Sequence, residues 1–305
     1  MNSETLDFSI VIPTYNRPDR LRQCLQSLTE LDYSRDRFEV VVVDDGSRDS
    51  LEPIVQPFAT DLNLNFRRQP NSGPANARNT GATAARGRYL VFTDDDCQPT
   101  PSWLTAVAVA LEAAPQALVG GKTLNALPHN ICSTASQLLI DYLYEFYNPV
   151  PEAATFFASN NFAVPRAQYL ELKGFDTQFP LAAGEDREFC DRWHYHQHPM
   201  RYAPAMQVRH AHQLTLKTFW RQHFNYGRGA FCFHKTRAHR TDGTIKVEKF
   251  QFYWRLLTYP FHHLPWPQAV RVAALMFVSQ VANVAGFFWE RSGQRRQAQL
   301  ATRQT

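Results

Sequence analysis

Three consecutive aspartates, Asp94, Asp95 and Asp96, follow the apolar run RYLVFT at residues 88–93. Adjacent carboxylates repel one another, so the cluster destabilises a compact state unless positive charge lies near it. Two carboxylates spaced D-x-D can bind a hard divalent cation through their oxygens, and that cation can bridge a diphosphate. The cluster therefore predicts a cation site at Asp94 and Asp96.

Polar clusters also follow three earlier strand-like runs, at residues 14–16, 44–47 and 71–73. Ligands of an open α/β sheet bind outside the carboxyl ends of its strands. One such cluster alone is typical of a solvated turn, but four in this position favour one shared crevice. The chain contains no GxxxxGK[ST] motif, and no GxGxxG follows its first strand-like run, which excludes the usual P-loop and dinucleotide sites.

The elements that position these clusters alternate between strands and helices. Continuous Val/Ile-rich runs are typical of parallel strands that are covered on both faces. The predicted strands span residues 8–16, 38–47, 64–69, 88–93 and 118–124, and the predicted helices 18–31, 73–87 and 184–197; residues 156–176 read as strand, turn and helix, and only helices follow residue 213. We therefore expect an α/β fold, a Rossmann-like and mostly parallel sheet flanked by helices, with a helical C-terminal extension.

The composition is that of a globular protein, with 305 residues of which 44% are hydrophobic and 20% charged. The first residues, MNSETLDFS, are polar and acidic, unlike a secretory signal, so we expect a cytoplasmic protein. Five widely spaced cysteines form no CxxC pattern. They predict reduced thiols and exclude a disulfide framework or a structural zinc site.

Five motifs in this order, PTYNRPDRL, VVDDGS, NSGPANARNTGA, TDDD and GEDREFCDRW, resemble the family 2 glycosyltransferases with the GT-A fold. The resemblance covers roughly residues 8–212. It implies a GT-A catalytic domain at 1–212 and a helical C-terminal region at 213–305. It also implies an inverting, metal-dependent transfer of a sugar from a nucleotide-diphosphate sugar to an acceptor hydroxyl, in cell-envelope polysaccharide or glycolipid synthesis.

The resemblance also assigns the donor site, residue by residue. The nucleotide-binding positions are Pro13 and Tyr15 beside the base, Asp44 and Asp45 at the uracil and ribose edge, and Arg78, Asn79 and Asp94 nearby. The metal positions are Asp94, Asp96 and His210, with Mn²⁺ or Mg²⁺ as the ion and His212 as a second histidine candidate. Asp95 fills the variable position of the DxD pair, where the resemblance implies that it faces solvent. A lone histidine is also commonly a structural group. UDP is the favoured donor nucleotide, and Cys97 stands where many relatives have another acid.

For the transfer itself, Asp186 matches the catalytic base and Glu185 its acidic neighbour. The alternative is an acidic first turn that stabilises a helix N-terminus. Asn160 and Asn161 match positions that contact the donor sugar, although asparagines are also ordinary turn formers. We assign Trp103 to the packing of the helix that follows it, with acceptor stacking as the alternative.

Two other functions compete with sugar transfer. A nucleotidyltransferase would carry a glycine-rich, basic loop after its first strand, and SIVIPTYNRP lacks those glycines. A non-catalytic sugar-nucleotide or glycan-binding module would not need both Asp96 and Asp186.

The C-terminal third is basic, since residues 209–241 contain seven Lys or Arg, five His and no acid. Residues 268–289 would form a helix of about 33 Å, but Arg271, Gln280 and Asn283 favour an amphipathic helix over a membrane span. Its apolar face comprises Val270, Ala274, Phe277, Val281, Val284 and Phe288. This face could lie in a membrane interface, pack on the catalytic domain or pair with another subunit.

The basic charge favours an anionic surface at the inner face of the membrane. The expected partners are therefore the sugar donor, a glycan or lipid-linked acceptor, and an anionic membrane. Nucleic acid is not expected, because no recognition motif accompanies the charge.

Overall fold

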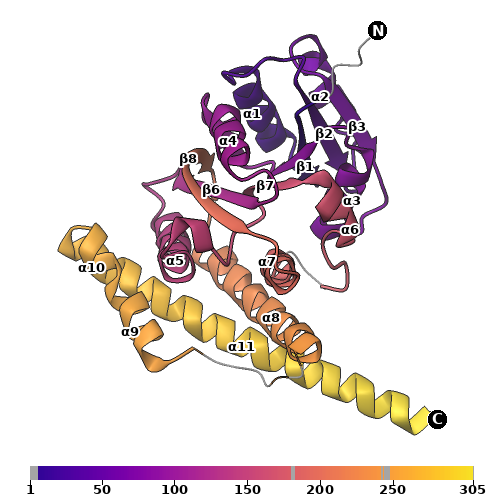
Figure 1. The fold of residues 1–305 in the computed structure, drawn as a ribbon. Coiled ribbons are helices and arrows are strands. Elements are labelled where there is room, and N and C mark those ends of the chain that lie inside the picture. Colours follow the sequence, from indigo (N-terminus) through magenta and orange to yellow (C-terminus); the bar gives the residue numbers. More distant parts are fainter. Residues whose placement is uncertain (1–5, 180–182, 242, 244–247, 305) are drawn as a thin grey trace. The chain divides into compact units, whose positions relative to one another are not determined.

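The computed structural model describes residues 6–179, 183–241, 243 and 248–304 (Figure 1). The chain divides into two compact units, which are described separately. The sheet unit comprises Met1–Ala126, Tyr144–Thr177 and Phe189–His212, and the helical unit comprises Leu127–Leu143, Gln178–Glu188 and Gln213–Thr305.

The sheet unit contains one eight-stranded sheet in the order β3-β2-β1-β4-β7-β6-β8-β5. The strands are β1 Phe8–Thr14, β2 Phe38–Asp44, β3 Leu64–Arg68, β4 Tyr89–Thr93, β5 Cys97–Pro99, β6 Leu118–Asn125, β7 Asn161–Pro165 and β8 Met200–His210. Strands β3, β2, β1 and β4 are mutually parallel, as expected. Beyond β4 the sheet is mixed, because β7 is antiparallel to both β4 and β6, and β5 is antiparallel to β8.

Helices connect and cover these strands. They are α1 Pro18–Thr29, α2 Glu52–Val55, α3 Pro74–Ala84, α4 Trp103–Ala113 and α6 Arg166–Glu171, with the 3-10 turns η1 Gln56–Thr60 and η2 Pro151–Ala153. Two further helices, α5 Ile131–Tyr147 and α7 Glu185–Tyr195, begin in the helical unit and end in the sheet unit. The α/β prediction is confirmed. Strands β5 and β8 were not expected, because β5 has only three residues and β8 contains Pro204 and carries a register shift against β6.

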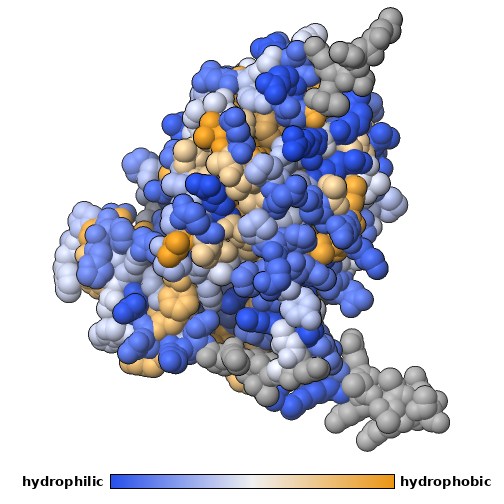
Figure 2. Space-filling model, in the orientation of Figure 1, coloured by the Kyte–Doolittle hydropathy of each residue, from blue (hydrophilic) through white to orange (hydrophobic). Residues whose placement is uncertain are grey.

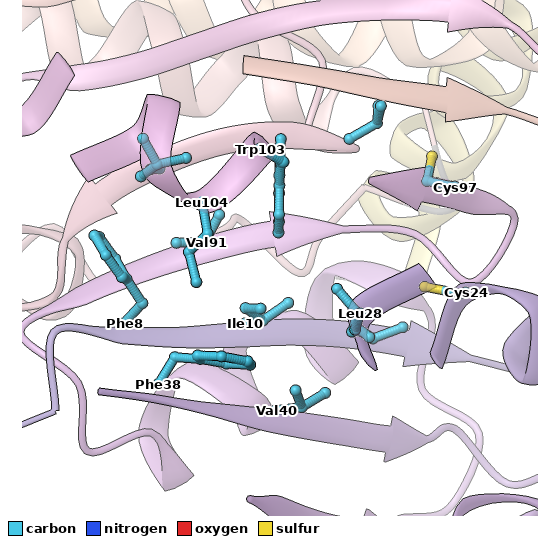
Figure 3. Close-up of a cluster of buried hydrophobic side chains, with 14 of the residues drawn as sticks. Phe8, Ile10, Cys24, Leu28, Phe38, Val40, Val91, Cys97, Trp103 and Leu104 are labelled. Atoms are coloured by element: carbon cyan, nitrogen blue, oxygen red, sulfur yellow. The ribbon is translucent and has the colours of Figure 1, made fainter. Parts of the chain in front are cut away.

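The core of the sheet unit lies between the strands and helices α1 and α4 (Figure 3). Every residue of β1, β2 and β4 is buried, which explains their continuous apolar sequences. Helix α1 contributes Leu21, Cys24, Leu25 and Leu28 to this cluster. Trp103 of α4 is fully buried, as its assignment to packing predicted. Burying each large apolar side chain contributes about 1.5–3 kcal/mol.

The helical unit is built around two long helices, α8 Leu216–Thr241 and α11 Trp266–Gln304, with α9 Phe250–Thr258 and α10 Pro260–His263 between them. Glycines bring α8 and α11 close together (Figure 1). A Cβ at Gly227 would lie 1.8 Å from the Asn283 oxygen, and one at Gly286 would lie 1.9 Å from the Phe224 oxygen. Any side chain at either glycine would therefore separate the helices.

No disulfide joins the five cysteines in the described part of the chain, in line with the prediction of reduced thiols; four are buried and Cys232 is partly buried.

A buried histidine on α8 makes the stability of the helical unit sensitive to acid. His223 is 1% exposed, and its Nε2 has no hydrogen-bond partner within the described part of the chain. Its ring contacts Phe219 and Tyr226, at centroid distances of 4.3 and 5.5 Å. Burial lowers the pKa of His223 from 6.5 to about 4, because the charged imidazolium loses its hydration.

We predict that acid destabilises the protein through His223. Since the folded-state pKa lies below the unfolded one, the contribution is present above pH 6.5 and is lost as the pH falls towards 4. The free energy of unfolding should decrease by about 2 kcal/mol between pH 7 and pH 5 from this group alone. Urea unfolding at both pH values measures the change.

His223→Leu should remove this part of the pH dependence, whatever its effect on stability at pH 7. The matched control is His196→Leu at the exposed position just after α7, which should keep the wild-type dependence. An unchanged pH dependence in His223→Leu would contradict the assignment.

Candidate functional site

The carboxyl ends of β1 and β2 place the first two polar clusters side by side. Thr14 is in register with Asp44, and the Asp45 amide donates to the Thr14 carbonyl at 2.9 Å. Pro13 is buried within β1, whereas the Tyr15 side chain, just beyond the strand, is 46% exposed. Tyr15 is thus available to stack on a planar ligand, and any role of Pro13 must be indirect.

Asp45 orders the loop after β3. Its Oδ1 accepts hydrogen bonds from Gln69 Nε2 at 2.7 Å and the Ser72 amide at 3.0 Å, and its Oδ2 accepts one from the Gly73 amide at 2.8 Å. A contact between Asp45 and a nucleotide stays a prediction, and it would have to coexist with these bonds or replace them.

Asp44 acts similarly on its own turn, accepting from the Ser47 amide at 2.9 Å and lying 3.5 Å from Arg68 Nε. In the same turn, Gly46 adopts a φ of 80°, and a Cβ there would lie 2.6 Å from the Asn71 nitrogen. The motif DDGS therefore requires glycine in its third position.

The aspartates after β4 are each compensated by positive groups of the protein. Arg78 Nη2 of α3 donates to Asp94 Oδ1 at 2.6 Å. Arg17 Nη1 and Thr14 Oγ1 donate to Asp95 at 3.0 and 2.8 Å. Asp95 is only 2% exposed, so the prediction that it faces solvent is wrong. It lies inward because Thr14 and Arg17 bind its two oxygens.

Asp96 lies at the centre of this charge cluster. Its Oδ2 accepts from Arg20 Nη1 at 2.8 Å and from Arg17 Nη1 at 3.3 Å, and its Oδ1 lies 3.2 Å from His210 Nε2. Burial alone would raise the pKa of Asp96, but His210 and Arg17 outweigh it and hold the pKa below its usual value. Asp96 is therefore an anion throughout the physiological range.

The neighbouring titratable groups respond to the same cluster. Burial raises the pKa of Asp95 to about 6, although Arg17 opposes it. Burial would lower the pKa of His210, but Asp96 raises it overall. His212, whose ring lies 4.8 Å from that of His210, has its pKa lowered to about 3 by burial and by His210. His210 is thus the histidine paired with Asp96, and His212 is neutral.

Strand pairing brings His210 to this position. Cys97 of β5 is in register with His210 at the end of β8, and the Ala211 amide donates to the Asp96 carbonyl at 2.8 Å. One ligand atom each of Asp96, Cys97 and His210 lies within 4.8 Å of the others. Burial raises the pKa of the Cys97 thiol well above its usual value, so it is a poor metal ligand.

The donor atoms present fit a divalent cation. Asp96 supplies carboxylate oxygens and His210 an imidazole nitrogen, and the Asp94 side chain is 28% exposed. Oxygen and imidazole ligands suit hard and borderline cations such as Mg²⁺ and Mn²⁺. Binding of the ion to Asp96 Oδ2 would replace some of the hydrogen bonds that this oxygen accepts from Arg17 and Arg20.

Arg17 and Arg20 are site residues that the sequence analysis did not identify. Both lie in the quoted motif PTYNRPDRL, and their side chains are 49% and 30% exposed. Two arginines just after the first strand were the available signal, since guanidinium groups bind phosphate oxygens well. The cluster is held together by ion pairs, in which the aspartates fix the positions of these arginines.

Asn79 connects α3 to the segment after α6. Its Nδ2 donates to the Phe175 carbonyl at 2.8 Å, and its Oδ1 accepts from Tyr169 Oη at 2.7 Å and from the Phe175 amide at 2.9 Å. With these bonds Asn79 supports the position of Arg78, whose guanidinium lies 5.7 Å from the Phe175 ring.

The two asparagines at β7 have different environments. Asn161 is fully buried; its Oδ1 accepts from Trp103 Nε1, and its Nδ2 donates to the carbonyls of Lys122 and Met206. It therefore joins β6, β8 and α4, which argues against direct contact with a sugar. Asn160 Oδ1 is buried and has no hydrogen-bond partner among the residues that the structure describes. Asn160 is thus the better candidate to bind a donor hydroxyl.

Glu185 and Asp186 form the first turn of α7 within the helical unit. The preceding Gly184 has a φ of 90°, and a Cβ there would lie 2.9 Å from the Gly229 oxygen of α8. Asp186 Oδ1 accepts from the Arg187 amide at 2.8 Å. The Asp186 carboxylate is half-buried, whereas Glu185 is 4% exposed, so Asp186 is the more accessible of the two.

Known proteins share sequence and fold with this chain. Residues 9–153 match the family model described as Glycosyl transferase family 2. The glycosyltransferase AglE of Haloferax volcanii is 36% identical over 122 residues, which cover 39% of this chain and 40% of AglE. The validoxylamine A glucosyltransferase of Streptomyces hygroscopicus subsp. jinggangensis is 30% identical over 220 residues, which cover 63% of this chain and 52% of that protein. The chain thus spans about half or less of these relatives.

Solved structures with the same fold extend over nearly the whole chain. The mannosyltransferase PcManGT of Pyrobaculum calidifontis, in complex with GDP-Man and Mn²⁺, superposes with a TM-score of 0.60 at 23% identity, over 97% of this chain and 80% of that one. S. aureus TarS 1-349 gives a TM-score of 0.55 at 19% identity, over 96% and 92% of the two chains. With the five ordered motifs, this sheet and these matches, residues 9–153 form a family 2 glycosyltransferase domain, and the chain has the GT-A fold.

Proposed function

We propose that this chain transfers a sugar from a nucleoside-diphosphate sugar to an acceptor hydroxyl with inversion at the anomeric carbon. One observation supports this most strongly: Asp94 and Asp96 meet Arg17, Arg20 and Arg78 at the carboxyl ends of the strands. A ligand with both a diphosphate and a bound cation matches such a mixed cluster, because arginines bind phosphate oxygens and carboxylates bind the cation.

The donor would be held by residues of several loops. Tyr15 would stack on the base, and the guanidinium groups of Arg17 and Arg20 would bind diphosphate oxygens. Asp94, Asp96 and His210 would hold Mn²⁺ or Mg²⁺, which supplies Lewis-acid stabilisation of charge on the leaving group. The buried Asn160 oxygen would accept a hydrogen bond from a sugar hydroxyl.

The transfer would need one base. Asp186 would take the proton of the acceptor hydroxyl while the oxygen of that hydroxyl bonds to the anomeric carbon. The bond between that carbon and the diphosphate oxygen breaks at the same time, and the nucleoside diphosphate leaves with the electron pair. Only one carboxylate near the sugar is required in such a single displacement.

The relatives guide the choice of substrates. The similar structures include TarS in complex with UDP and with UDP-GlcNAc, and PcManGT in complex with GDP-Man. We favour UDP as the nucleotide and a glycan or lipid-linked acceptor of the cell envelope. The match to the glycosyltransferase family argues against a nucleotidyltransferase. A non-catalytic donor-binding module differs from a transferase in that it does not need Asp186 as a base.

The first prediction concerns the cation site. Asp96→Asn keeps the shape of the side chain but removes its charge, so Mn²⁺-dependent binding of the donor nucleotide should be lost or weakened at least tenfold. Calorimetry with UDP, in Mn²⁺ and in chelator, measures this. Asp19→Asn, at a highly exposed position of α1, is the control and should bind as wild type. Equal Mn²⁺-dependent affinity in the two variants would remove Asp96 from the site.

The second prediction concerns Asp186. Asp186→Asn keeps an oxygen to accept the Arg187 amide but cannot take a proton at neutral pH. Transfer should therefore fall about 10²–10⁴-fold, while donor affinity and melting temperature stay near wild type. Product formation, nucleotide binding and thermal unfolding are measured on one preparation.

Asp191→Asn, further along the same helix, is the matched control and should retain turnover. If Asp186 serves only the helix N-terminus, its substitution lowers stability by about 0.3–1 kcal/mol and leaves turnover per folded molecule unchanged. That result would favour a binding module over a transferase.

A further inference from the structure

Helix α11 presents its apolar face outward. Between Val272 and Trp289, every exposed residue is apolar: Ala274, Phe277, Val278, Val281, Val284, Ala285, Phe288 and Trp289. The polar residues of the same stretch lie on the other side, where Ser279 is 1% exposed and Gln280 and Asn283 are half-buried. A helix on the surface of a globular protein normally has the opposite arrangement.

The exposed face is continuous and large. Trp266, Phe277, Val284 and Phe288 are 72%, 57%, 55% and 53% exposed, and they recur at helical spacing along one side of α11. The molecular face drawn in Figure 2 is mainly hydrophilic, with apolar side chains interspersed, as is usual for protein surfaces. A contiguous exposed apolar stripe instead indicates an interaction surface.

The charge of the C-terminal region selects among possible partners. Residues 213–305 contain 14 Lys or Arg and 3 Asp or Glu, a net charge of +11, whereas residues 1–212 carry −7. Two copies joined through α11 would bring two strongly basic regions together, which repel each other. An anionic surface attracts the same region.

The ends of the stripe also fit a membrane interface. Trp266 and Trp289 are both exposed, and their rings suit the boundary between headgroups and acyl chains. Arg271 lies near the start of the stripe, and Arg295 and Arg296 are exposed beyond its end. From Trp266 to Trp289 the helix is about 36 Å long.

The helix is long and apolar enough to span a bilayer by length and composition alone. Its contact with α8 argues against a span. Gly227 and Gly286 hold the two helices together, and α8 exposes the charged side chains of Lys217, Arg221 and Lys235. These charges could not follow α11 into the hydrocarbon core without a large cost, so α11 would lie in the plane of the surface.

We infer that the exposed face of α11 docks the protein on an anionic lipid membrane, with the helix axis parallel to the surface. The apolar stripe enters the boundary of the acyl chains, and the basic residues of the helical unit contact lipid phosphates. None of the residues of this stripe is among those proposed for sugar transfer.

The test is sedimentation of the full chain with vesicles of phosphatidylcholine, with and without phosphatidylglycerol. Binding should require the anionic lipid and should decrease as salt rises. Phe277→Ser combined with Phe288→Ser removes exposed apolar area without disturbing packing, and should reduce the partition coefficient at least tenfold. The matched control combines Val109→Ser and Leu170→Ser, exposed apolar positions of the sheet unit, and should bind as wild type.

A second measurement tests the orientation. Tryptophan fluorescence should shift to shorter wavelength on vesicle binding, and Trp289→Phe should remove part of that shift. Equal binding to neutral vesicles, or unchanged binding of the Phe277→Ser/Phe288→Ser variant, would overturn the proposal. The proposal would also be overturned if the wild type formed a dimer in analytical ultracentrifugation, did not bind anionic vesicles, and lost the dimer in this variant. The exposed face of α11 would then bind a second copy of the chain.

Discussion

The constraint on which this site depends is the mutual repulsion of three adjacent carboxylates. Asp94, Asp95 and Asp96 each need a positive partner in a partly buried place. The protein provides a different arginine set for each, from α3 and from the turn that begins α1, with His210 as a further partner of Asp96. The protein's own side chains therefore supply positive charge to all three aspartates. A cation bound to Asp96 would replace some of the hydrogen bonds from Arg17 and Arg20. Cation binding would therefore release these two arginine side chains to bind other anions.

The mixed part of the sheet beyond β4 contributes His210 to this charge cluster. The short β5 directly after the aspartates pairs with β8 in the antiparallel sense, and Cys97 is in register with His210. Asn161 stabilises the place where β6 shifts register against β8, since its amide bonds the carbonyls of Lys122 and Met206. The mixed half of the sheet thus carries a histidine to an aspartate more than a hundred residues away.

The parts predictable from sequence were those with a local pattern. The parallel strands, helix α1 and the clusters at the strand ends each follow from continuous apolar runs, helical spacing and turn residues. The burial of Asp95 could not be predicted this way, because it depends on Thr14 and Arg17, which are distant in sequence. Strand β8 was missed because Pro204 and its register shift interrupt any regular alternation. The role of Asn161 likewise depends on three segments that only the fold brings together.

Helix α11 marks a different limit of sequence patterns. Periodicity identifies an apolar side of a helix, but it does not say which medium covers that side. In α11 the close contact of Gly227 and Gly286 with the facing backbone fixes the rotation of the helix about its axis. This rotation turns Ser279 and Asn283 towards the protein and Phe277, Val284 and Phe288 away from it. An apolar stripe on a helix generally indicates a buried surface. In α11 the side that packs within the unit is the one that carries Gly286, so the apolar stripe must be covered by something outside the unit.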